Sequence, residues 1–285
     1  MGGLGNQLFQ IFTTMALAIE LKEKFMFPNN LYMGTRTRTY WDTLLKELKN
    51  SVMVKPAISS LKIPLYKEVG FNYNKINVSR DMVNKSGGLL LYGYFQSYKY
   101  FEQEYEKIVK YIKLDEQRKI VRDAYFKERD VVDCIISLHF RMGDYKMLQD
   151  CHPIMDIEYY IKSIGFILDK LKSSDTPINR VTILCFFEKE DAASVLTKIA
   201  LIKKQYPLIV FKFVDNDSKM EDWQQVLLMS CCQHNIIANS SFSWWGAYFN
   251  DNPQKIVCYP SKWFGTKLQS HDISDMCPST WHKIE

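Results

Sequence analysis

The stretch CIISLHFRMGDY, at residues 134–145, decides the fold of this chain. It opens with a near-continuous run of apolar and small residues, which is typical of a strand buried on both faces of a parallel sheet. The run ends at His139, Arg141 and Asp144, so charge appears where the strand stops. Ligands of open α/β sheets bind outside the carboxyl ends of the strands, and the sequence therefore predicts a binding site here.

Arg141 is the most informative residue of this stretch. Its planar guanidinium has five N–H donors, keeps its charge and binds phosphate through two parallel hydrogen bonds. The glycine that follows lets backbone come close to a ligand. We therefore expect an anion site, and a diphosphate leaving group would fit it. The alternative is an ordinary surface salt bridge between Arg141 and Asp144.

Strands and helices alternate regularly after residue 134. Beginning with a strand, the predicted elements cover residues 134–140, 156–172, 181–187, 189–204, 208–214, 221–232, 235–238, 241–250 and 254–259. Strands that alternate with helices of this length indicate a parallel, doubly wound sheet. The second half is therefore predicted to be a Rossmann-like domain, with His139 and Arg141 at the ligand edge of its first strand.

The first half is less regular. A glycine-rich turn, MGGLGNQ, precedes a predicted helix over residues 8–24. Free N–H groups at that helix start could bind phosphate or sugar oxygens, and a simple loop is the alternative. Further predicted elements are a helix near 40–49, a strand at 88–95 and helices at 98–114 and on to about 129. Residues 28–85 read as loops that recognise an acceptor, and the polar segment 127–133 reads as a hinge between two domains.

Composition narrows the class of protein. The chain has 285 residues, enough for two domains with cores of their own. Seven cysteines, an odd number, and the lack of a secretory signal predict reduced thiols in a cytoplasmic protein. No cysteine or histidine spacing is typical of a metal site, so we expect no metal.

The charge balance excludes further classes. A net charge of +5, from 37 basic and 32 acidic residues, is too mild and too dispersed for a nucleic-acid-binding protein. No run of about 18 apolar residues could span a bilayer. The basic balance permits peripheral contact with the anionic inner face of a membrane.

The segment HNIIANSSFSWWGAYFN, at residues 234–250, is a second strand that ends in a polar turn. Ser240 and Ser241 are good N-cap residues before an aromatic helix. Their hydroxyls and the free amides of the helix start form a second anion site, which would face Arg141 if both strands lie in one sheet. The alternative is an ordinary capped helix whose aromatic side chains fill the core.

Four segments occur in order over nearly the whole chain: GGLGNQLFQ, GYFQSYKYF, HFRMGDY and HNIIANSSFSWWGAYFN. Together they resemble the bacterial α-1,2-fucosyltransferases, an inverting family related to the α-1,6- and protein O-fucosyltransferases. The resemblance implies an α/β fold of the glycosyltransferase B (GT-B) type, with two Rossmann-like domains and the donor site on the C-terminal one. The acceptor-side domain would cover residues 1–130, and the GDP-fucose-binding domain would cover residues 131–285.

The same resemblance implies the reaction. L-Fucose would pass from GDP-fucose to the 2-hydroxyl of a terminal galactose in a glycan, with inversion and without a metal ion or other cofactor. Arg141 would hold the pyrophosphate, and His139 would lie by the guanosine. The donor would also contact Gly5, Asn6, Asp222, Ser240, Ser241 and the backbone of Phe242. Fixed positive donors of this kind can stabilise a departing diphosphate.

The sequence departs from the family pattern at three places. Met142 stands where the family usually has a second arginine. The family's FSDD is replaced by FEKED at residues 187–191. The family's first strand normally precedes GGLGNQ, where this chain has Met1. We therefore expect either a trimmed start or an amino-terminal sheet that lacks one strand.

Some alternatives stay open. A non-catalytic nucleotide-sugar or glycan-binding protein could keep this fold, and a transferase could use another GDP-sugar. The base that removes the acceptor proton is also open. Asp144 and Asp150 follow Arg141 out of the same strand end and are the candidates. Asp144 could instead orient Arg141, and some related fucosyltransferases lack any such base.

Overall fold

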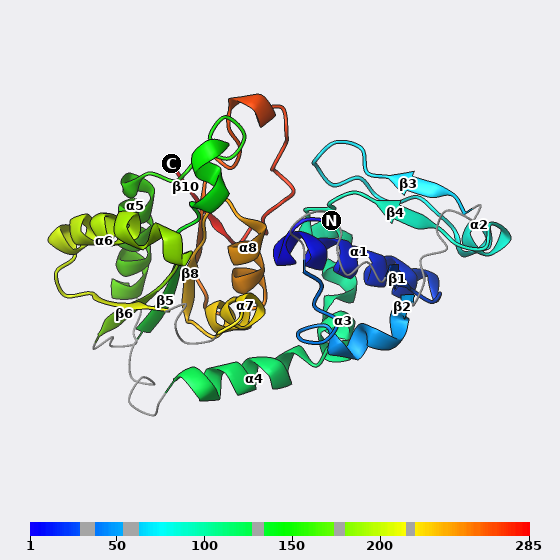
Figure 1. Ribbon diagram of the computed structural model, residues 1–285, viewed down its shortest axis with the longest axis horizontal. Helices are drawn as coiled ribbons and strands as arrows, with labels where there is room; N and C mark the ends of the chain where they lie inside the picture. Colours follow the sequence, from blue (N-terminus) through cyan, green and yellow to red (C-terminus); the bar gives the residue numbers. More distant parts are fainter. Residues whose placement is uncertain (29–37, 54–62, 127–133, 174–179, 215–219) are drawn as a thin grey trace. The chain divides into compact units, whose positions relative to one another are not determined.

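The computed structural model describes residues 1–28, 38–53, 63–126, 134–173, 180–214 and 220–285. It divides into two compact units (Figure 1). The first unit comprises Met1–Gln117 and His271–Pro278, and the second comprises Arg118–Ser270 and Ser279–Glu285. The division falls inside helix α4 (Leu114–Tyr125). The predicted hinge and the predicted boundary at residue 130 lie in the segment 127–133, outside the described residues.

A six-stranded sheet in the order β10-β9-β8-β5-β6-β7 forms the centre of the second unit. Its strands are β5 (Cys134–His139), β6 (Val181–Phe186), β7 (Val210–Phe213), β8 (His234–Ile236), β9 (Val257–Pro260) and β10 (His282–Ile284). All neighbouring pairs are parallel, which confirms the predicted parallel α/β sheet. The sequence does not predict β10, because the three residues HKI carry too short a pattern.

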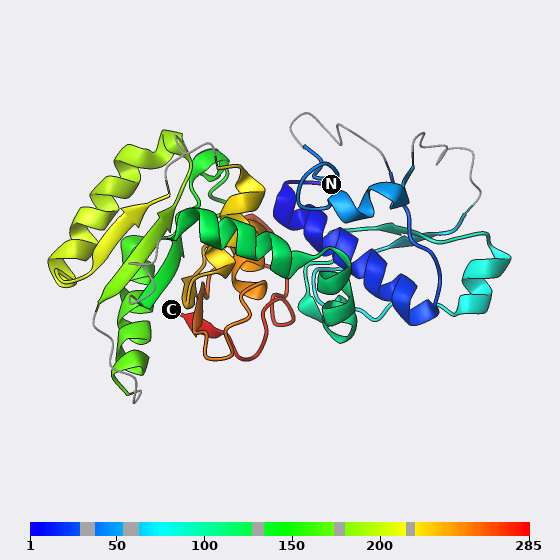
Figure 2. The same cartoon turned by 90° about the horizontal axis from the view of Figure 1, so that it is seen from below.

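Helices cover both faces of this sheet. Helices α5 (Ile157–Lys172) and α6 (Ala192–Gln205) lie on one face, and α7 (Asp222–Ser230) and α8 (Ser241–Tyr248) lie on the other (Figures 1 and 2). The chain moves from β5 outward to β7 and then returns past β5 to β8. Right-handed crossovers in opposite directions place their helices on opposite faces, which explains this arrangement.

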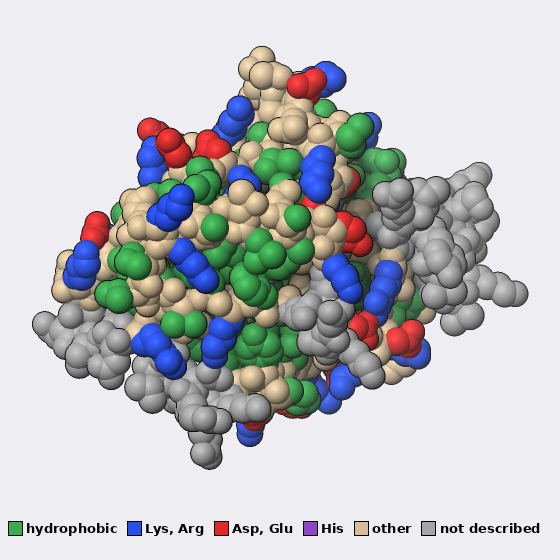
Figure 3. Space-filling view, turned by 60° about the vertical axis from the view of Figure 1, so that its left-hand side comes forward, with side chains coloured by type: hydrophobic (Ala, Val, Ile, Leu, Met, Phe, Trp, Pro, Cys, Tyr) green, Lys and Arg blue, Asp and Glu red, His purple; other side chains and the backbone are tan. Residues whose placement is uncertain are grey.

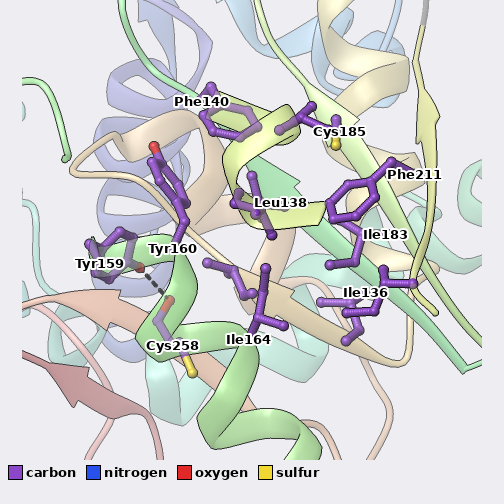
Figure 4. Close-up of a cluster of buried hydrophobic side chains, with 14 of the residues drawn as sticks. Ile136, Leu138, Phe140, Tyr159, Tyr160, Ile164, Ile183, Cys185, Phe211 and Cys258 are labelled. Atoms are coloured by element: carbon purple, nitrogen blue, oxygen red, sulfur yellow. Dashed lines mark hydrogen bonds between the residues drawn. The ribbon is translucent and has the colours of Figure 1, made fainter. Parts of the chain in front are cut away.

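The core of the second unit is built around β5. This strand is buried along its whole length, which explains its near-continuous apolar run. Ile136 and Leu138 join a cluster with residues from α5, β6 and β7 (Figure 4). The Tyr159 hydroxyl of α5 donates to the backbone carbonyls of Ile237 at 2.5 Å and Cys258 at 3.1 Å. The Tyr159 hydroxyl thereby has hydrogen-bond partners inside the core, and these bonds connect α5 to the sheet.

The first unit is organised on helix α1 (Leu4–Leu21). The ring of Phe12 on its buried face meets Phe101 edge to face, with centroids 5.6 Å apart. Two small parallel sheets also belong to this unit, β1 (Phe27–Pro28) with β2 (Val52–Met53) and β3 (Leu65–Lys67) with β4 (Leu90–Tyr92). Within the described residues this unit has no larger sheet. A second Rossmann-like domain therefore stays a prediction.

Three predicted helices of the first unit are corrected. Helix α1 begins at Leu4 rather than residue 8, because Gly3 takes the extended N-cap conformation. The segment 40–49 forms turns and then a 3-10 helix at Lys46–Ser51. The predicted helix over 98–114 is divided into short 3-10 turns and α3 (Tyr105–Tyr111). Lys113 has a positive φ of 52°, which interrupts the helical conformation of the chain before α4 begins.

Candidate functional site

Two neighbouring strands, β5 and β8, end at the same edge of the sheet. Leu138 and Ile236 are register partners in this parallel pair. The strand order reverses between them, because the chain builds β6 and β7 on one side of β5 and β8 and β9 on the other. Open α/β sheets bind ligands at such a switch point. The two predicted anion sites should face each other if both strands lie in one sheet. The pairing of β5 with β8 fulfils this condition.

Arg141 follows β5 and has partners on three sides. Its two terminal nitrogens donate to Glu188 and to Asp144. Its guanidinium also lies over the Tyr145 ring, with Cζ 4.8 Å from the centroid. Burial works against its charge, but the carboxylates of Glu188 and Asp144 outweigh it and hold the pKa of Arg141 above its ordinary value. Arg141 is therefore a fixed cation at the switch point.

The loop after β6 is bound to the loop after β5. Asp191 is buried and accepts from the Gly143 N–H at 2.8 Å, and Lys146 Nζ lies 2.5 Å from its other oxygen. Gly143 has a φ of +37°, and a Cβ at this position would lie 2.5 Å from a Glu188 oxygen. A glycine is therefore needed here. The FEKED segment, whose role the sequence leaves open, supplies both of these carboxylates.

His139, the last residue of β5, is buried and neutral. Burial, aided by the nearby Arg141 charge, lowers the pKa of His139 to about 3. Its Nδ1 atom has no hydrogen-bond partner among the described residues, and its ring lies 5.5 Å from that of Phe242. A buried ring nitrogen left unpaired is costly, so His139 is suited to a hydrogen bond with an uncharged group.

Helix α8 begins at Ser241, after the four residues that follow β8. Ser240 is its N-cap, and the Ser240 hydroxyl accepts from the Phe242 N–H at 3.3 Å. Ser241 is the first helical residue and is partly exposed. The predicted helix start is confirmed in position. The Phe242 N–H, expected to bind phosphate, donates to the cap, so Ser241 and the remaining first-turn amides are the better placed donors.

Asp222 lies at the start of helix α7. It is the first residue of the helix, and its carboxylate accepts from the Trp223 N–H at 2.8 Å. Glu221 before it forms a capping box with Gln224. The indole nitrogen of Trp223 is buried and has no partner within the described part of the chain. Asp222 thus has a structural contact of its own beside the nucleotide contact predicted for it.

The two candidate bases lie in different surroundings. Asp144 contacts Arg141, while Asp150 lies 3.3 Å from Lys267 in an exposed ion pair. The Asp150 carbonyl accepts from the Lys267 N–H at 2.9 Å, and a Cβ on Gly265 would come within 2.3 Å of it. Asp150 is thereby fixed by the chain near residue 265, whereas Asp144 is fixed by the predicted cation itself.

Gly5 and Asn6 belong to the first unit. Both lie in the first turn of α1, rather than in a turn before a helix at residue 8. The side-chain oxygen of Asn6 accepts from Gln96 at 2.7 Å, and Gly2, with a φ of +77°, packs against Asn6 so closely that a Cβ would lie 2.5 Å from it. The contact of Gly5 and Asn6 with the donor stays a prediction.

Several residues of this region receive roles that the sequence does not predict. Tyr145 and Glu188 contact Arg141, and Asn239 binds the carbonyls of Pro153 and Trp263 through its amide at 2.9 and 3.0 Å. Met142, at the position of the family's usual second arginine, is buried against the core cluster. The positions of Tyr145 and Asn239 within the two motifs could have marked them as candidate site residues. Their partners could not be predicted, because the sheet brings the contacting side chains together.

Three predicted absences concern the whole chain. Within the ranges described here, no group of three or more His, Cys, Asp or Glu residues could hold a metal ion. No helix in those ranges is long and apolar enough to cross a membrane. Figure 3 shows Lys and Arg scattered among acidic and apolar side chains on one face. Metal independence, peripheral membrane contact and the lack of a nucleic-acid partner stay predictions.

Comparisons with known proteins agree with one another. The sequence model of glycosyl transferase family 11 matches residues 2–284. The O-antigen biosynthesis glycosyltransferase WbnK of Escherichia coli is 26% identical over 94% of this chain and 95% of its own length. An alpha-1,2-colitosyltransferase of Escherichia coli is 27% identical over 100% of this chain and 97% of its own.

Two more distant proteins are also similar. A galactoside 2-alpha-L-fucosyltransferase of Caenorhabditis elegans is 26% identical over 64% of this chain and 46% of its own length. Among solved structures, a mutant of Arabidopsis thaliana FUT1 in complex with GDP aligns with 91% of this chain and 68% of its own, at 10% identity and a TM-score of 0.45.

Proposed function

This chain belongs to glycosyl transferase family 11, and from that premise we propose that it transfers L-fucose from GDP-fucose to the 2-hydroxyl of a terminal galactose in a glycan, with inversion. The observation that carries the proposal is the placement of Arg141 and the start of α8 at the ends of neighbouring strands. Two similar proteins are named for α-1,2-colitosyl and galactoside 2-α-L-fucosyl transfer, which supports this linkage.

The proposed architecture is of the GT-B type, with the donor bound by the second unit. The reversal of strand order between β5 and β8 supports this placement, because nucleotides bind at such points in parallel sheets. The acceptor would be recognised by the first unit. GDP-fucose is a substrate, and no further cofactor is required by the proposal.

Departure of GDP is the step that Arg141 would assist. The bond between the fucose anomeric carbon and the β-phosphate oxygen breaks, and negative charge develops on the diphosphate. Arg141 can exchange Glu188 and Asp144 for phosphate oxygens, since its fork fits phosphate as it fits carboxylate. Ser241 and the first amides of α8 would supply further donors that are oriented before the reaction.

The guanosine part of the donor would lie by His139. A neutral imidazole with an unpaired nitrogen can exchange a hydrogen bond with a base or ribose without placing a second positive charge beside Arg141. Asp222 would approach guanine or ribose from the start of α7. The N–H groups of guanine are donors, and a carboxylate is their natural acceptor.

Proton removal from the acceptor hydroxyl has two candidate groups. The contact between Asp144 and Arg141 supports an orienting role for Asp144. In inverting transfer the hydroxyl attacks opposite the leaving GDP, and a carboxylate within hydrogen-bond reach would take its proton. Asn substitutions separate these roles, because they keep the shape of the side chain and remove its basicity.

A related donor is a second candidate. The colitosyltransferase is similar to this chain over its whole length, and colitose is fucose without one ring hydroxyl. A site for colitose leaves no partner for that hydroxyl, whereas a site that hydrogen-bonds it rejects the deoxy sugar strongly. The ratio of kcat/KM for GDP-fucose and GDP-colitose therefore decides between the two donors.

The test is a transfer assay with the full chain. We expect GDP release from GDP-fucose to depend on lactose, and lactose to gain the mass of one deoxyhexose at the galactose 2-hydroxyl. GDP-mannose and GDP-colitose serve as competing donors. GDP binding without any transfer would instead support a non-catalytic binding protein. Neither binding nor transfer with any GDP-sugar would contradict the proposal.

A further inference from the structure

We infer that Tyr145 is a positioning residue that fixes the distance and orientation between Arg141 and the start of α8. The inference rests on the proposed function, since these two groups are the proposed holders of the donor diphosphate. Tyr145 lies in the short 3-10 helix Gly143–Met147 after β5 and contacts groups from both strand ends. Three contacts carry the inference.

The first contact is with Arg141. The guanidinium carbon lies 4.8 Å from the centre of the Tyr145 ring, a distance typical of a cation–π interaction. The N–H edge of the guanidinium, where phosphate would bind, donates to Glu188 and Asp144. The carboxylates of Glu188 and Asp144 must give up that edge to a diphosphate. The ring keeps its contact while this exchange takes place.

The second contact is between the rings of Tyr145 and His152. The His152 ring is stacked on Tyr145, with centroids 4.8 Å apart and planes inclined by 20°. Tyr145 therefore has ring contacts with both Arg141 and His152. The His152 ring in turn lies 5.8 Å from Phe264. The ring plane is therefore set by the surrounding chain.

The third contact joins Tyr145 to the other strand end. Its hydroxyl donates to the backbone carbonyl of Asn239 at 3.2 Å. Burial raises the pKa of Tyr145 above its ordinary value, so the hydroxyl stays protonated as this bond requires. Asn239 is itself buried and fixed by two side-chain hydrogen bonds. The next residue, Ser240, is the N-cap of α8, so one side chain links the cation to the helix start.

A purely structural role would predict a different pattern of effects. If Tyr145 only packs the loop, its loss lowers stability and affects every ligand and variant alike. If it positions Arg141, its loss weakens diphosphate binding only while Arg141 is present. A double-mutant cycle measures this dependence, because coupled residues give non-additive effects.

The experiment is calorimetric titration of GDP into the full chain and its variants. We expect Tyr145→Leu to weaken GDP binding roughly five- to thirtyfold, the range of a partly buried cation–π contact. Tyr145→Phe keeps the ring but loses the hydrogen bond to Asn239, and we expect it to weaken GDP binding by about threefold, less than Tyr145→Leu does. In an Arg141→Gln background, Tyr145→Leu should weaken binding by less than about twofold. Met147→Ala, an exposed change in the same 3-10 helix, is the matched control.

The outcomes separate the inference from the proposed function. Unchanged GDP affinity in Tyr145→Leu, or losses that simply add in the Arg141→Gln background, would overturn the inference alone. Lack of GDP binding by the wild-type chain would overturn the proposed function and the inference with it. Thermal unfolding monitors the fold of each variant. If Tyr145→Leu unfolds, Tyr145→Met, which also lacks a ring but keeps a long side chain, gives the same test.

Discussion

The loop after β5 and the start of α8 offer positive charge in two different ways. The first offers a full charge on Arg141, whose side chain is 24% exposed and is already paired with two carboxylates. The second offers a hydroxyl and backbone N–H groups on a helix that Ser240 caps. One side chain carries the charge in the first case, and several groups share it in the second. Single substitutions should therefore cost far more at the β5 end than at α8.

The largest effect is expected at Arg141. Arg141→Lys keeps the charge but loses the fork, and we expect kcat/KM to fall about ten- to a thousandfold, which is about 1 to 4 kcal/mol of transition-state stabilisation. Steady-state kinetics with GDP-fucose and lactose measure it. Arg122→Lys, an exposed arginine of α4, is the matched control. Near-normal kcat/KM in Arg141→Lys would show that the diphosphate is held elsewhere.

Substitution of Asp144 distinguishes two possible roles of this residue, which are the positioning of Arg141 and the removal of the acceptor proton. If Asp144 is the base, Asp144→Asn should lower kcat about a hundredfold with GDP affinity nearly unchanged. If it orients Arg141, GDP binding should weaken in proportion to the rate. Kinetics and GDP titration of Asp144→Asn and Asp150→Asn distinguish these roles, with exposed Asp169→Asn as control. Normal turnover in both variants would exclude a carboxylate base from this loop.

At the end of β5, the charged Arg141 lies near the neutral His139. The pKa of His139 is lowered to about 3 by burial and by Arg141. Histidine in the unfolded chain titrates near 6.5, so between these values the unfolded chain binds the extra proton and acidification favours unfolding. We expect His139 to lower the free energy of unfolding by up to about 1.4 kcal/mol per pH unit as the pH falls below about 6.5.

Urea denaturation between pH 7 and 5 tests this contribution. The pH dependence should be shallower in His139→Gln than in the wild-type chain. Part of the slope should remain, because burial also lowers the pKa of His234, to about 4. Equal slopes in both proteins would mean that His139 is protonated in the folded state as readily as in the unfolded one.

A smaller effect is expected at the helix start. Ser240→Ala removes an N-cap and should lower the free energy of unfolding by about 1 kcal/mol, while GDP affinity falls by only a few fold because the other donors of α8 remain. Ser79→Ala, at the N-cap of α2 (Arg80–Lys85), is matched in chemistry and should leave GDP affinity unchanged. A loss at Ser240 as large as that at Arg141 would invalidate the contrast between the two regions.

No effect is expected from metal removal. Binding of the diphosphate is assigned to Arg141 and α8, and the described segments contain no group of three or more His, Cys, Asp or Glu residues that could hold a metal ion. Transfer activity should therefore be the same in excess EDTA as in buffer with magnesium. Loss of activity in EDTA that magnesium or manganese restores would show that a metal carries part of this charge.

The second unit could be predicted because its elements are strongly patterned. Buried runs such as 134–139 and 181–186 alternate with amphipathic helices, and the end of β5 then places Arg141 at an edge. In the first unit, β4 lies within the predicted strand 88–95, whereas the two residues of β1 are too few to show a period. The sequence does not predict the start of α1 at Leu4, because its N-cap, Gly3, has no capping side chain that would mark a helix start.

Within the site, residue types could be predicted but partners could not. The anion-binding character of Arg141 follows from its chemistry and its place after a strand. Its contacts with Glu188 and Tyr145 follow from the pairing of β5 with β6 and from the 3-10 turn after β5. The contact with Glu188 depends on tertiary structure, and the contact with Tyr145 depends on a local turn whose side-chain geometry the sequence does not predict. Met142 could not be placed in the core from a motif in which the family has arginine.

The central claim is that Arg141 and the start of α8 hold the diphosphate of GDP. Titration of wild-type and Arg141→Gln protein with GDP and with guanosine tests it most directly, because the two ligands differ only in the diphosphate. We predict that wild-type protein binds GDP at least about a hundredfold more tightly than guanosine, and that Arg141→Gln removes most of this difference while guanosine binding is retained. Equal preference for GDP in both proteins would contradict the account.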